Sequence, residues 1–344
     1  MLLLVLLQIV IGIGLAEAVG QALFGNPFYY WNYRFLYTSP DSLRDIDDTW
    51  TYQPDREIAE VAVYETPLGH LFQEYACRYQ SDDMGFVDNP RSGQRQYDVL
   101  VLGDSFTFGQ AGCSWADELR AALPELSVYV AGMQGTRPDT WEANLRYLLR
   151  RGYRFREIVL VFIGDDFFRP RFLWSKSSLA CMHDVTACHG DEYFYPLAPG
   201  LDLLKASAER AKLRRSNDLG PRLGYFADRY LWVSAFLARR AWDLITGARP
   251  SPAIPAEIGA ALDRMRASVP ALQLVRVVEK DEEALHADDA DSIRVGKYLA
   301  ARNLDFSTCR IGYDGYFRYE GHPNPKGYKR FAECLAWVVL GTMQ

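Results

Sequence analysis

Residues 97–109, YDVLVLGDSFTFG, decide the fold that the sequence predicts. The run from Val99 to Leu102 is apolar and too short for a helix, so it fits a parallel strand that is covered on both faces. The turn Gly103-Asp104-Ser105 follows, and the next helix is expected to begin near Gly112. Open α/β sheets bind ligands at the carboxyl ends of their strands. Ser105 should therefore face a crevice, beside helix N–H groups that favour negative charge.

Strands and helices alternate along the rest of the chain, which predicts an α/β fold with a doubly wound parallel sheet. The further strands are predicted at 127–131, 157–163, 272–278 and 304–306, and the helices at 115–123, 138–151, 257–267, 292–301 and 326–340. A flavodoxin-like, three-layer α/β/α domain is expected over residues 97–344, with a helical insertion at about 167–255. The acidic run 279–291 is expected to be a solvated loop and helix start, without the spaced oxygens of a calcium loop.

Composition sets the class of protein. Of 344 residues, 49% are hydrophobic and 14% aromatic, which is enough for a substantial core in one large or two modest domains. The net charge is −6, the pI is near 5.5, and Lys and Arg form no basic stripe. We therefore expect no nucleic-acid partner, and no motif predicts a cofactor or a metal site.

Residues 1–26 form a largely apolar segment of about the length that crosses a bilayer. One interpretation is a signal peptide cleaved after Ala16-Glu17-Ala18, and the other is an uncleaved transmembrane helix. The anchor is favoured because no Lys or Arg precedes the apolar run, and because the aromatic cluster at 28–33 resembles an interfacial belt. The lipid bilayer is then a predicted partner, with the main domain on the periplasmic or extracytoplasmic side.

Residues 27–96 form the lead-in to the α/β domain. Their short alternating apolar segments, broken by Pro and Gly, predict β-hairpins. We expect this ribbon to pack on the edge of the sheet and to have no chemical role.

The six cysteines are an even number, which suits an oxidising compartment. Cys181 and Cys188 bracket a short loop and are predicted to form a local disulfide. A zinc site that adds His183 and His189 is the alternative, although the spacing matches no usual zinc motif. The remaining four can form two more bridges in a pairing that the sequence leaves open: Cys77, Cys113, Cys309 and Cys334.

The residues Gly103 to Gly109, GDSFTFG, resemble the nucleophile block of the SGNH or GDSL hydrolase family, and the other blocks follow in order. The lead-in is similar to that of membrane-anchored SGNH proteins from bacterial envelopes. Family members are α/β proteins that cleave or transfer ester-linked acyl groups. The resemblance implies that Ser105 is the nucleophile and that His322, followed by Pro-Asn, is the general base. It also implies that the N–H groups of Ser105 and Gly135 hold the oxyanion, with Gly132 as the other possible register.

Two positions depart from the family pattern. Asp165 stands where an asparagine is the third oxyanion donor, and an ionised carboxylate cannot donate a hydrogen bond. Asp165 could serve only if burial and Asp166 keep it protonated by raising its pKa. The usual Asp three residues before the histidine is also absent. Glu320 is therefore the expected orienting acid, with Asp314 in reserve.

Together these residues predict a serine esterase or acyltransferase outside the cytoplasm, which acts on an ester. By resemblance, the expected substrate is the O-acetyl group of a glycan. The departures at Asp165 and Glu320 support a second hypothesis: a catalytically impaired SGNH fold that serves as an accessory or scaffold subunit with protein partners in a membrane complex.

Overall fold

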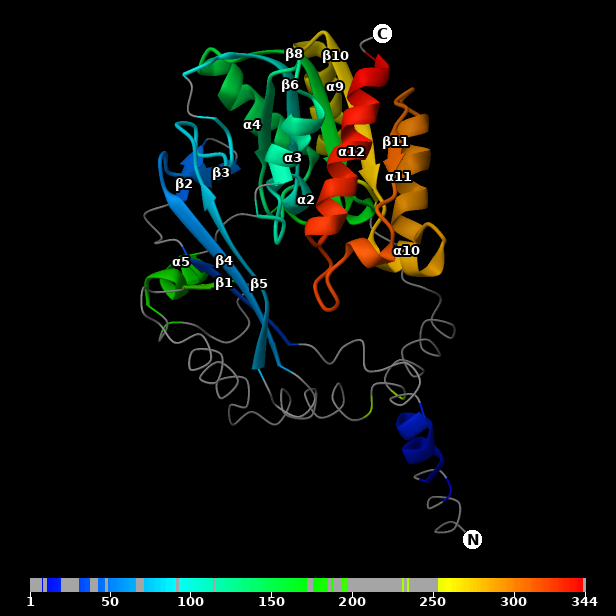
Figure 1. Cartoon of the computed structure of the whole chain (residues 1–344). Coiled ribbons are helices and arrows are strands. Elements are labelled where there is room, and N and C mark those ends of the chain that lie inside the picture. The colour runs from blue at the N-terminus through cyan, green and yellow to red at the C-terminus, as the bar shows by residue number, and fades with distance from the viewer. Residues whose placement is uncertain are drawn as a thin grey trace.

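A five-stranded parallel sheet forms the centre of the fold (Figure 1). Its strands are β6 (Gln96–Gly103), β7 (Val128–Gly132), β8 (Arg154–Phe162), β10 (Ala271–Val277) and β11 (Ser307–Cys309). Their order across the sheet is β11-β10-β8-β6-β7, so the first strand lies between the second and the third. The sheet is doubly wound with its switch point between β6 and β8, and the predicted α/β fold class is confirmed.

The computed structural model describes residues 8, 11–19, 31–37, 43–46, 49–65, 71–90, 93–113, 115–171, 176–184, 187, 194–196, 231, 234 and 253–342.

The central sheet has a separate hydrophobic core on each face, because alternate side chains of a strand point to opposite sides. Val99 and Val101 of β6 belong to one core, and Leu100 and Leu102 belong to the other. Two helices cover the first face, α3 (Trp115–Ala122) and α12 (Pro325–Thr342). Three helices cover the second face, α4 (Pro138–Arg150), α9 (Ala256–Ser268) and α11 (Ala290–Ala300). The domain therefore has three layers.

The helix predicted near Gly112 begins earlier and comes in two pieces. The Asp104 carboxylate accepts a hydrogen bond from the N–H two residues further on at 2.9 Å, so α2 (Ser105–Phe108) starts directly after it. Gly109 then adopts a left-handed backbone conformation with φ of 84° and ends α2 after one turn. The longer helix α3 follows a loop.

The last strand lies three residues beyond its predicted position at 304–306. The N–H of Leu304 donates to Leu299 O at 3.0 Å, and Asn303 has a left-handed φ of 54°. These residues therefore close the end of α11, and pairing with the sheet begins only at Ser307.

The acidic run is solvated only in part: residues 284–290 are exposed and lead into the start of α11, as predicted, but two carboxylates before them are buried. It contains α10 (Lys280–Leu285), in which Glu282 is buried and pairs with Arg276 of β10 at 2.5 Å. Glu283 is also buried and accepts hydrogen bonds from the N–H groups of Ile311 and Gly312 at 3.0 and 3.1 Å. Charge density alone misled the prediction, because these carboxylates face an arginine and backbone donors.

The lead-in forms a second, four-stranded sheet in the order β5-β4-β1-β9, together with a short hairpin. Its strands are β1 (Trp31–Tyr37), β4 (Glu57–Glu65), β5 (Leu71–Gln80) and β9 (Phe194–Pro196), and the hairpin consists of β2 (Leu43–Ile46) and β3 (Thr49–Tyr52). Strand β9 comes from the long insertion and pairs in parallel with β1. Most of the predicted insertion at 167–255, including the helices expected there, lies outside the described residues.

The lead-in packs against the edge of the α/β domain and also against the nucleophile helix. Asn89 donates to and accepts from the backbone of Val130, on edge strand β7, at 2.8 Å in each case. Tyr79 of β5 donates to Gly109 O at 3.0 Å, and its ring lies 4.8 Å from that of Phe108. The second sheet is therefore in direct contact with α2.

Two disulfides are defined, and they settle the pairing that the sequence left open. Cys77 of β5 is bonded to Cys113, after α2, and Cys309 of β11 is bonded to Cys334 of α12. Cys181 is disulfide-bonded as well, so its sulfur cannot be the thiolate ligand of the alternative zinc site. Cys188 and His189 lie outside the described residues, and the predicted Cys181–Cys188 bond stays a prediction.

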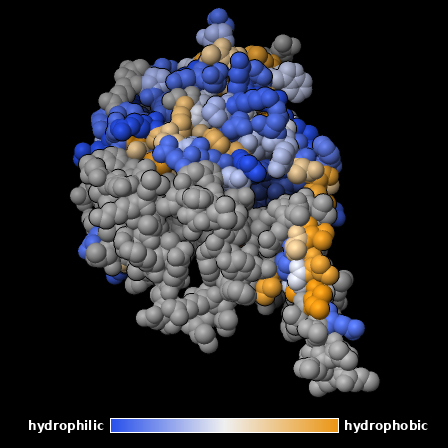
Figure 2. All heavy atoms as spheres, turned by 60° about the horizontal axis from the view of Figure 1, so that its bottom comes forward, coloured by the Kyte–Doolittle hydropathy of each residue, from blue (hydrophilic) through white to orange (hydrophobic). Residues whose placement is uncertain are grey.

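Residues 11–19 are helical and carry exposed apolar side chains, at Ile11, Ile13, Leu15 and Val19. Figure 2 shows hydrophobic side chains of this N-terminal segment in orange. Within the described parts of the chain, no helix has both the length and the hydropathy needed to span a membrane. Much of the predicted anchor at 1–26 lies outside those parts.

Candidate active site

Ser105 is the first residue of α2 and lies where β6 ends, at the carboxyl edge of the central sheet. The turn is tight because Gly103 leaves no room for a side chain: a Cβ there would lie 2.1 Å from Thr107 Oγ1 and 2.6 Å from Val161 O. Ser105 is 6% exposed, and its hydroxyl also contacts Asp104 Oδ2 at 3.2 Å. The sequence motif thus presents one serine, almost enclosed, at the switch-point end of the sheet.

The structure brings Ser105, His322 and Glu320 into one hydrogen-bonded chain. Ser105 Oγ lies 2.8 Å from His322 Nε2, and His322 Nδ1 lies 2.5 Å from Glu320 Oε1. The glutamate is 1% exposed and the histidine 8% exposed. A buried carboxylate on Nδ1 keeps the proton there and leaves Nε2 free to accept the proton of the serine, which is the arrangement of a nucleophile, base and orienting acid.

The loop that carries His322 is fixed at both ends. Asn324 donates from its backbone N–H to Gly315 O at 2.8 Å and from its side chain to Tyr316 O at 2.9 Å, and Pro325 then begins α12. On the other side, Glu74 of β5 accepts a hydrogen bond from the N–H of Tyr319 at 2.9 Å. The lead-in sheet therefore holds the residue directly before Glu320.

Asp314, the reserve acid, takes no part in this chain. It is an exposed surface residue that pairs with Arg330 at 2.6 Å and with Lys326. These cations hold the pKa of Asp314 well below its usual value. Glu320 is the only one of the two candidate acids that contacts the imidazole.

The two candidate glycines have different surroundings. Gly132 ends β7 opposite Gly103, and a Cβ there would lie 2.1 Å from Phe108 N, so it permits close packing of the strand on α2. Gly135 lies in the following loop with φ of 68°. The same loop is tied to the nucleophile turn by the Met133 N–H, which donates to Gly103 O at 3.1 Å. Gly132 therefore has a packing role, and Gly135 stays the predicted donor.

A buried carboxylate in the lead-in supports this loop, and we did not predict it. Glu60 of β4 is fully buried and accepts a hydrogen bond from Gln134 Nε2 at 3.0 Å, directly before Gly135. Its other oxygen accepts from the hydroxyl of Tyr75 at 2.9 Å. The signal in the sequence is one acidic residue between Ile58 and Ala62, in register with two core residues of its strand.

Asp165 is part of an ion cluster that also escaped prediction. Arg169 contacts Asp165 at 2.6 Å, Asp166 at 2.9 Å and Asp104 at 3.1 Å. Burial raises the pKa of Asp165, and Arg169 opposes that rise. The Asp165 side chain is 47% exposed and pairs with Arg169, and both features favour the ionised carboxylate against the effect of burial. The protonated form that the donor role would need is favoured by burial and opposed by Arg169.

The other carboxyl groups around Arg169 do not all ionise together, because burial and neighbouring negative charges raise the pKa of two of them. Asp166 is fully buried, and burial together with the charge of Asp104 raises the pKa of Asp166 well above its usual value. Glu279, just after β10, has a pKa of about 8, raised first by burial and then by the charges of Asp165 and Asp289. This side of the site is therefore rich in carboxyl groups but carries less negative charge than its composition implies.

Comparisons with known proteins give a likeness to solved structures only. No family model matches the sequence, and no curated protein is significantly similar to it. A proposed lipolytic protein of the G-D-S-L family from Desulfitobacterium hafniense DCB-2 matches at a TM-score of 0.35 and 11% identity, over 71% of this chain and 99% of its own. A lipolytic G-D-S-L family member from Veillonella parvula DSM 2008 matches at 0.32 and 11%, and a carbohydrate acetylesterase family member from Sinorhizobium meliloti at 0.32 and 14%. Each of these two covers 72% of this chain and 99% of its own.

Proposed function

We propose that this chain is a serine esterase of the SGNH type, with Ser105 as its nucleophile. The observation that supports this most strongly is the Ser105–His322–Glu320 chain, with contacts of 2.8 and 2.5 Å at the carboxyl edge of a parallel sheet. A serine that only capped a helix would need neither a histidine on its hydroxyl nor a buried carboxylate behind that histidine.

In the proposed reaction, Ser105 Oγ attacks the carbonyl carbon of an ester while His322 Nε2 takes its proton. The N–H groups of Ser105 and Gly135 donate to the oxyanion, and Glu320 stabilises the imidazolium. His322 then returns the proton to the leaving alcohol. Water or another hydroxyl, deprotonated by His322, releases the acyl group from Ser105.

A small acyl group, such as the acetyl ester of a glycan, is the substrate that we propose. Ser105 and His322 are only 6% and 8% exposed, so a long acyl chain has little room to approach. The expected result is that p-nitrophenyl acetate is hydrolysed faster than the butyrate and octanoate esters. Faster hydrolysis of the octanoate ester would contradict the proposed small acyl group. The assignment of Ser105 as the nucleophile would stand.

The proposed location is the extracytoplasmic side of a membrane, with residues 1–26 as the anchor. The disulfides Cys77–Cys113 and Cys309–Cys334 support an oxidising compartment. Fractionation of the native protein, with and without carbonate extraction of the membranes, tests the anchor. A released, shortened chain would favour the signal peptide.

Covalent labelling tests the nucleophile. The purified full chain is treated with a fluorophosphonate probe beside its Ser105→Ala variant, and we expect labelling of the parent only. An unlabelled parent that is folded by circular dichroism would contradict an activated serine. It would instead favour the scaffold role, for which the Asp165 carboxylate is the motivating observation, and a partner that copurifies in equal amount would support that role.

A further inference from the structure

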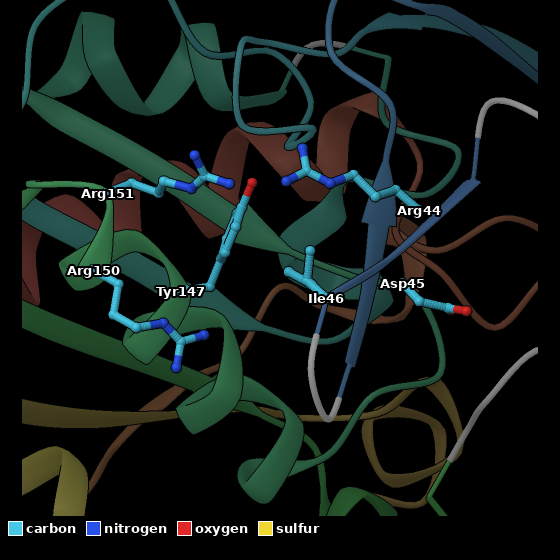
Figure 3. Close-up of a pocket in the computed structure, with 6 residues that line it drawn as sticks. All are labelled: Arg44, Asp45, Ile46, Tyr147, Arg150 and Arg151. Atoms are coloured by element: carbon cyan, nitrogen blue, oxygen red, sulfur yellow. The ribbon is translucent and has the colours of Figure 1, made fainter.

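A second site lies at the far end of α4 from the nucleophile. The pocket has a volume of about 370 Å³ and is lined by β2 and the end of α4, with Arg44, Asp45, Ile46, Tyr147, Arg150 and Arg151 (Figure 3). Helix α4 starts three residues after Gly135 and is 13 residues long, which corresponds to roughly 20 Å. The pocket is therefore separate from the candidate active site.

Two arginines from different elements converge on one tyrosine. The guanidinium carbon of Arg44, on β2, lies 5.4 Å from the ring centroid of Tyr147, and that of Arg151 lies 5.6 Å from it. Figure 3 shows the tyrosine hydroxyl between the two guanidinium groups. The ring is 5% exposed, so it is a fixed platform that holds both cations beside its hydroxyl.

Neither of these guanidinium groups has an acidic partner among the residues that the structure describes. Asp45 lines the pocket, but its carboxylate points away from them in Figure 3. Arg150 also lines the pocket, but its guanidinium points away from the other two in Figure 3. The two guanidinium groups repel each other, and an anion bound between them would lower the electrostatic energy of the pocket.

The ordinary role of cations at the end of a helix explains only part of this arrangement. Arg150 and Arg151 complete α4 and interact favourably with its negative end. Arg44 belongs to a strand of the lead-in hairpin and has no such reason to face the same ring. An external anion accounts for the convergence of Arg44 and Arg151 on Tyr147.

We propose that this pocket binds a phosphate group. A carboxylate is satisfied by the fork of a single guanidinium, whereas a phosphate has more oxygens and up to two negative charges for several donors. Two guanidinium forks and the Tyr147 hydroxyl supply those donors from different directions. The pocket is larger than a single phosphate requires, which favours a phosphate ester with an organic part.

Calorimetric titration of the purified full chain with inorganic phosphate and with glycerol phosphate tests the proposal. We expect both to bind, and we expect Arg44→Ala and Arg151→Ala each to weaken binding by about tenfold or more, since each removes charge-assisted hydrogen bonds. Tyr147→Phe keeps the ring and should give a smaller loss. Arg266→Ala, which removes an exposed arginine on α9, is the matched control and should bind as the parent does.

Two results would overturn the proposal: no binding of either phosphate by the folded parent, or an equal loss in the Arg266→Ala control. Arg44→Lys is a second variant in case Arg44→Ala fails to fold. It keeps the positive charge and removes only the paired N–H donors of the guanidinium group. Vesicles that contain phosphatidic acid, compared with phosphatidylcholine alone, distinguish a lipid headgroup from a soluble phosphate. The titration tests the pocket independently of the proposed esterase activity, because the Ser105→Ala variant should bind phosphate as the parent does.

Discussion

In the function that we propose, Asp165 is the residue that departs most from an ordinary oxyanion hole, and its ion pair with Arg169 offers a way to tolerate the departure. The guanidinium lies 2.6 Å from the carboxylate and neutralises the charge that would otherwise repel a developing oxyanion. Neutralisation does not supply the missing hydrogen-bond donor. One such donor is typically worth about 10²- to 10³-fold in rate.

We therefore predict that Asp165→Asn raises kcat for p-nitrophenyl acetate by about tenfold or more, because the amide can donate where the carboxylate cannot. Asp263→Asn is the control, since Asp263 also pairs with an arginine, Arg302 at 3.0 Å, but on the exposed surface. An unchanged or lower kcat in Asp165→Asn would show that the Arg169 pair itself is required.

Glu279 makes the stability of the folded chain depend on pH. Its pKa is about 8 in the folded state, against an ordinary value of 4.5, so the folded state keeps a proton that the unfolded state has lost between those values. The free energy of unfolding should therefore fall as pH rises from about 5 to 8, by at most about 1.4 kcal/mol per pH unit from this group.

Urea unfolding at pH 5, 6.5 and 8.5 measures this dependence. Buried neighbours such as Asp166 add a slope of the same sign, so the informative quantity is the difference from Glu279→Gln, whose decline with pH should be shallower. Glu333→Gln, a glutamate of α12 outside the cluster, should follow the parent. Parallel curves for the parent and Glu279→Gln would contradict the raised pKa.

At the scale of elements, the lead-in sheet takes part in building the site. Glu60 of β4 accepts a hydrogen bond from Gln134, in the loop that carries Gly135. Glu74 of β5 accepts one from the N–H of Tyr319, in the loop that carries Glu320. The ribbon was predicted to have no chemical role. Two of its carboxylates nevertheless contact the loops that carry Gly135 and Glu320, residues of the proposed site.

Glu60→Gln should lower kcat by about tenfold while KM changes little. The amide cannot accept hydrogen bonds from both Gln134 and Tyr75, so the Gly135 loop loses its support, and Gly135 acts mainly in the transition state. Glu57→Gln, at the exposed end of the same strand and paired with Arg78, is the matched control. Equal falls in kcat and in melting temperature for both variants would indicate a general loss of the sheet instead.

How far the sequence could predict these elements depends on the distance between the partners in the chain. The parallel strands followed from local apolar runs, and the serine, histidine and glutamate from contiguous motifs. The Glu60–Gln134 contact joins residues 74 positions apart and has no local pattern. The buried carboxylates of the acidic run were missed for the same reason, because the burial of Glu282 depends on Arg276 of β10.

At the scale of the whole molecule, the two disulfides that are defined between described residues join different parts of the fold. Cys309–Cys334 joins a strand and a helix within the α/β domain, whereas Cys77–Cys113 joins the lead-in sheet to the loop after the nucleophile helix. Their sequence separations of 25 and 36 residues give similar chain-entropy contributions, about 3 to 4 kcal/mol each.

Double Cys→Ser variants separate stability from activity. Both pairs should lower the melting temperature to a similar extent, but only Cys77→Ser with Cys113→Ser should also reduce esterase kcat at a temperature where both variants remain folded. That bridge holds β5, and β5 holds the loop that carries Glu320. Equal activity in the two double variants would show that the lead-in stays in place without its covalent link.

The Cys77–Cys113 bond also has a consequence for the timing of activity during biogenesis. A chain that is threaded across a membrane before it folds arrives with its thiols reduced and its two sheets not yet fastened together. In the extracytoplasmic location that we propose, oxidation of this pair would fasten the lead-in sheet to the loop after α2 and so complete the proposed site. The proposed activity would then appear only after export.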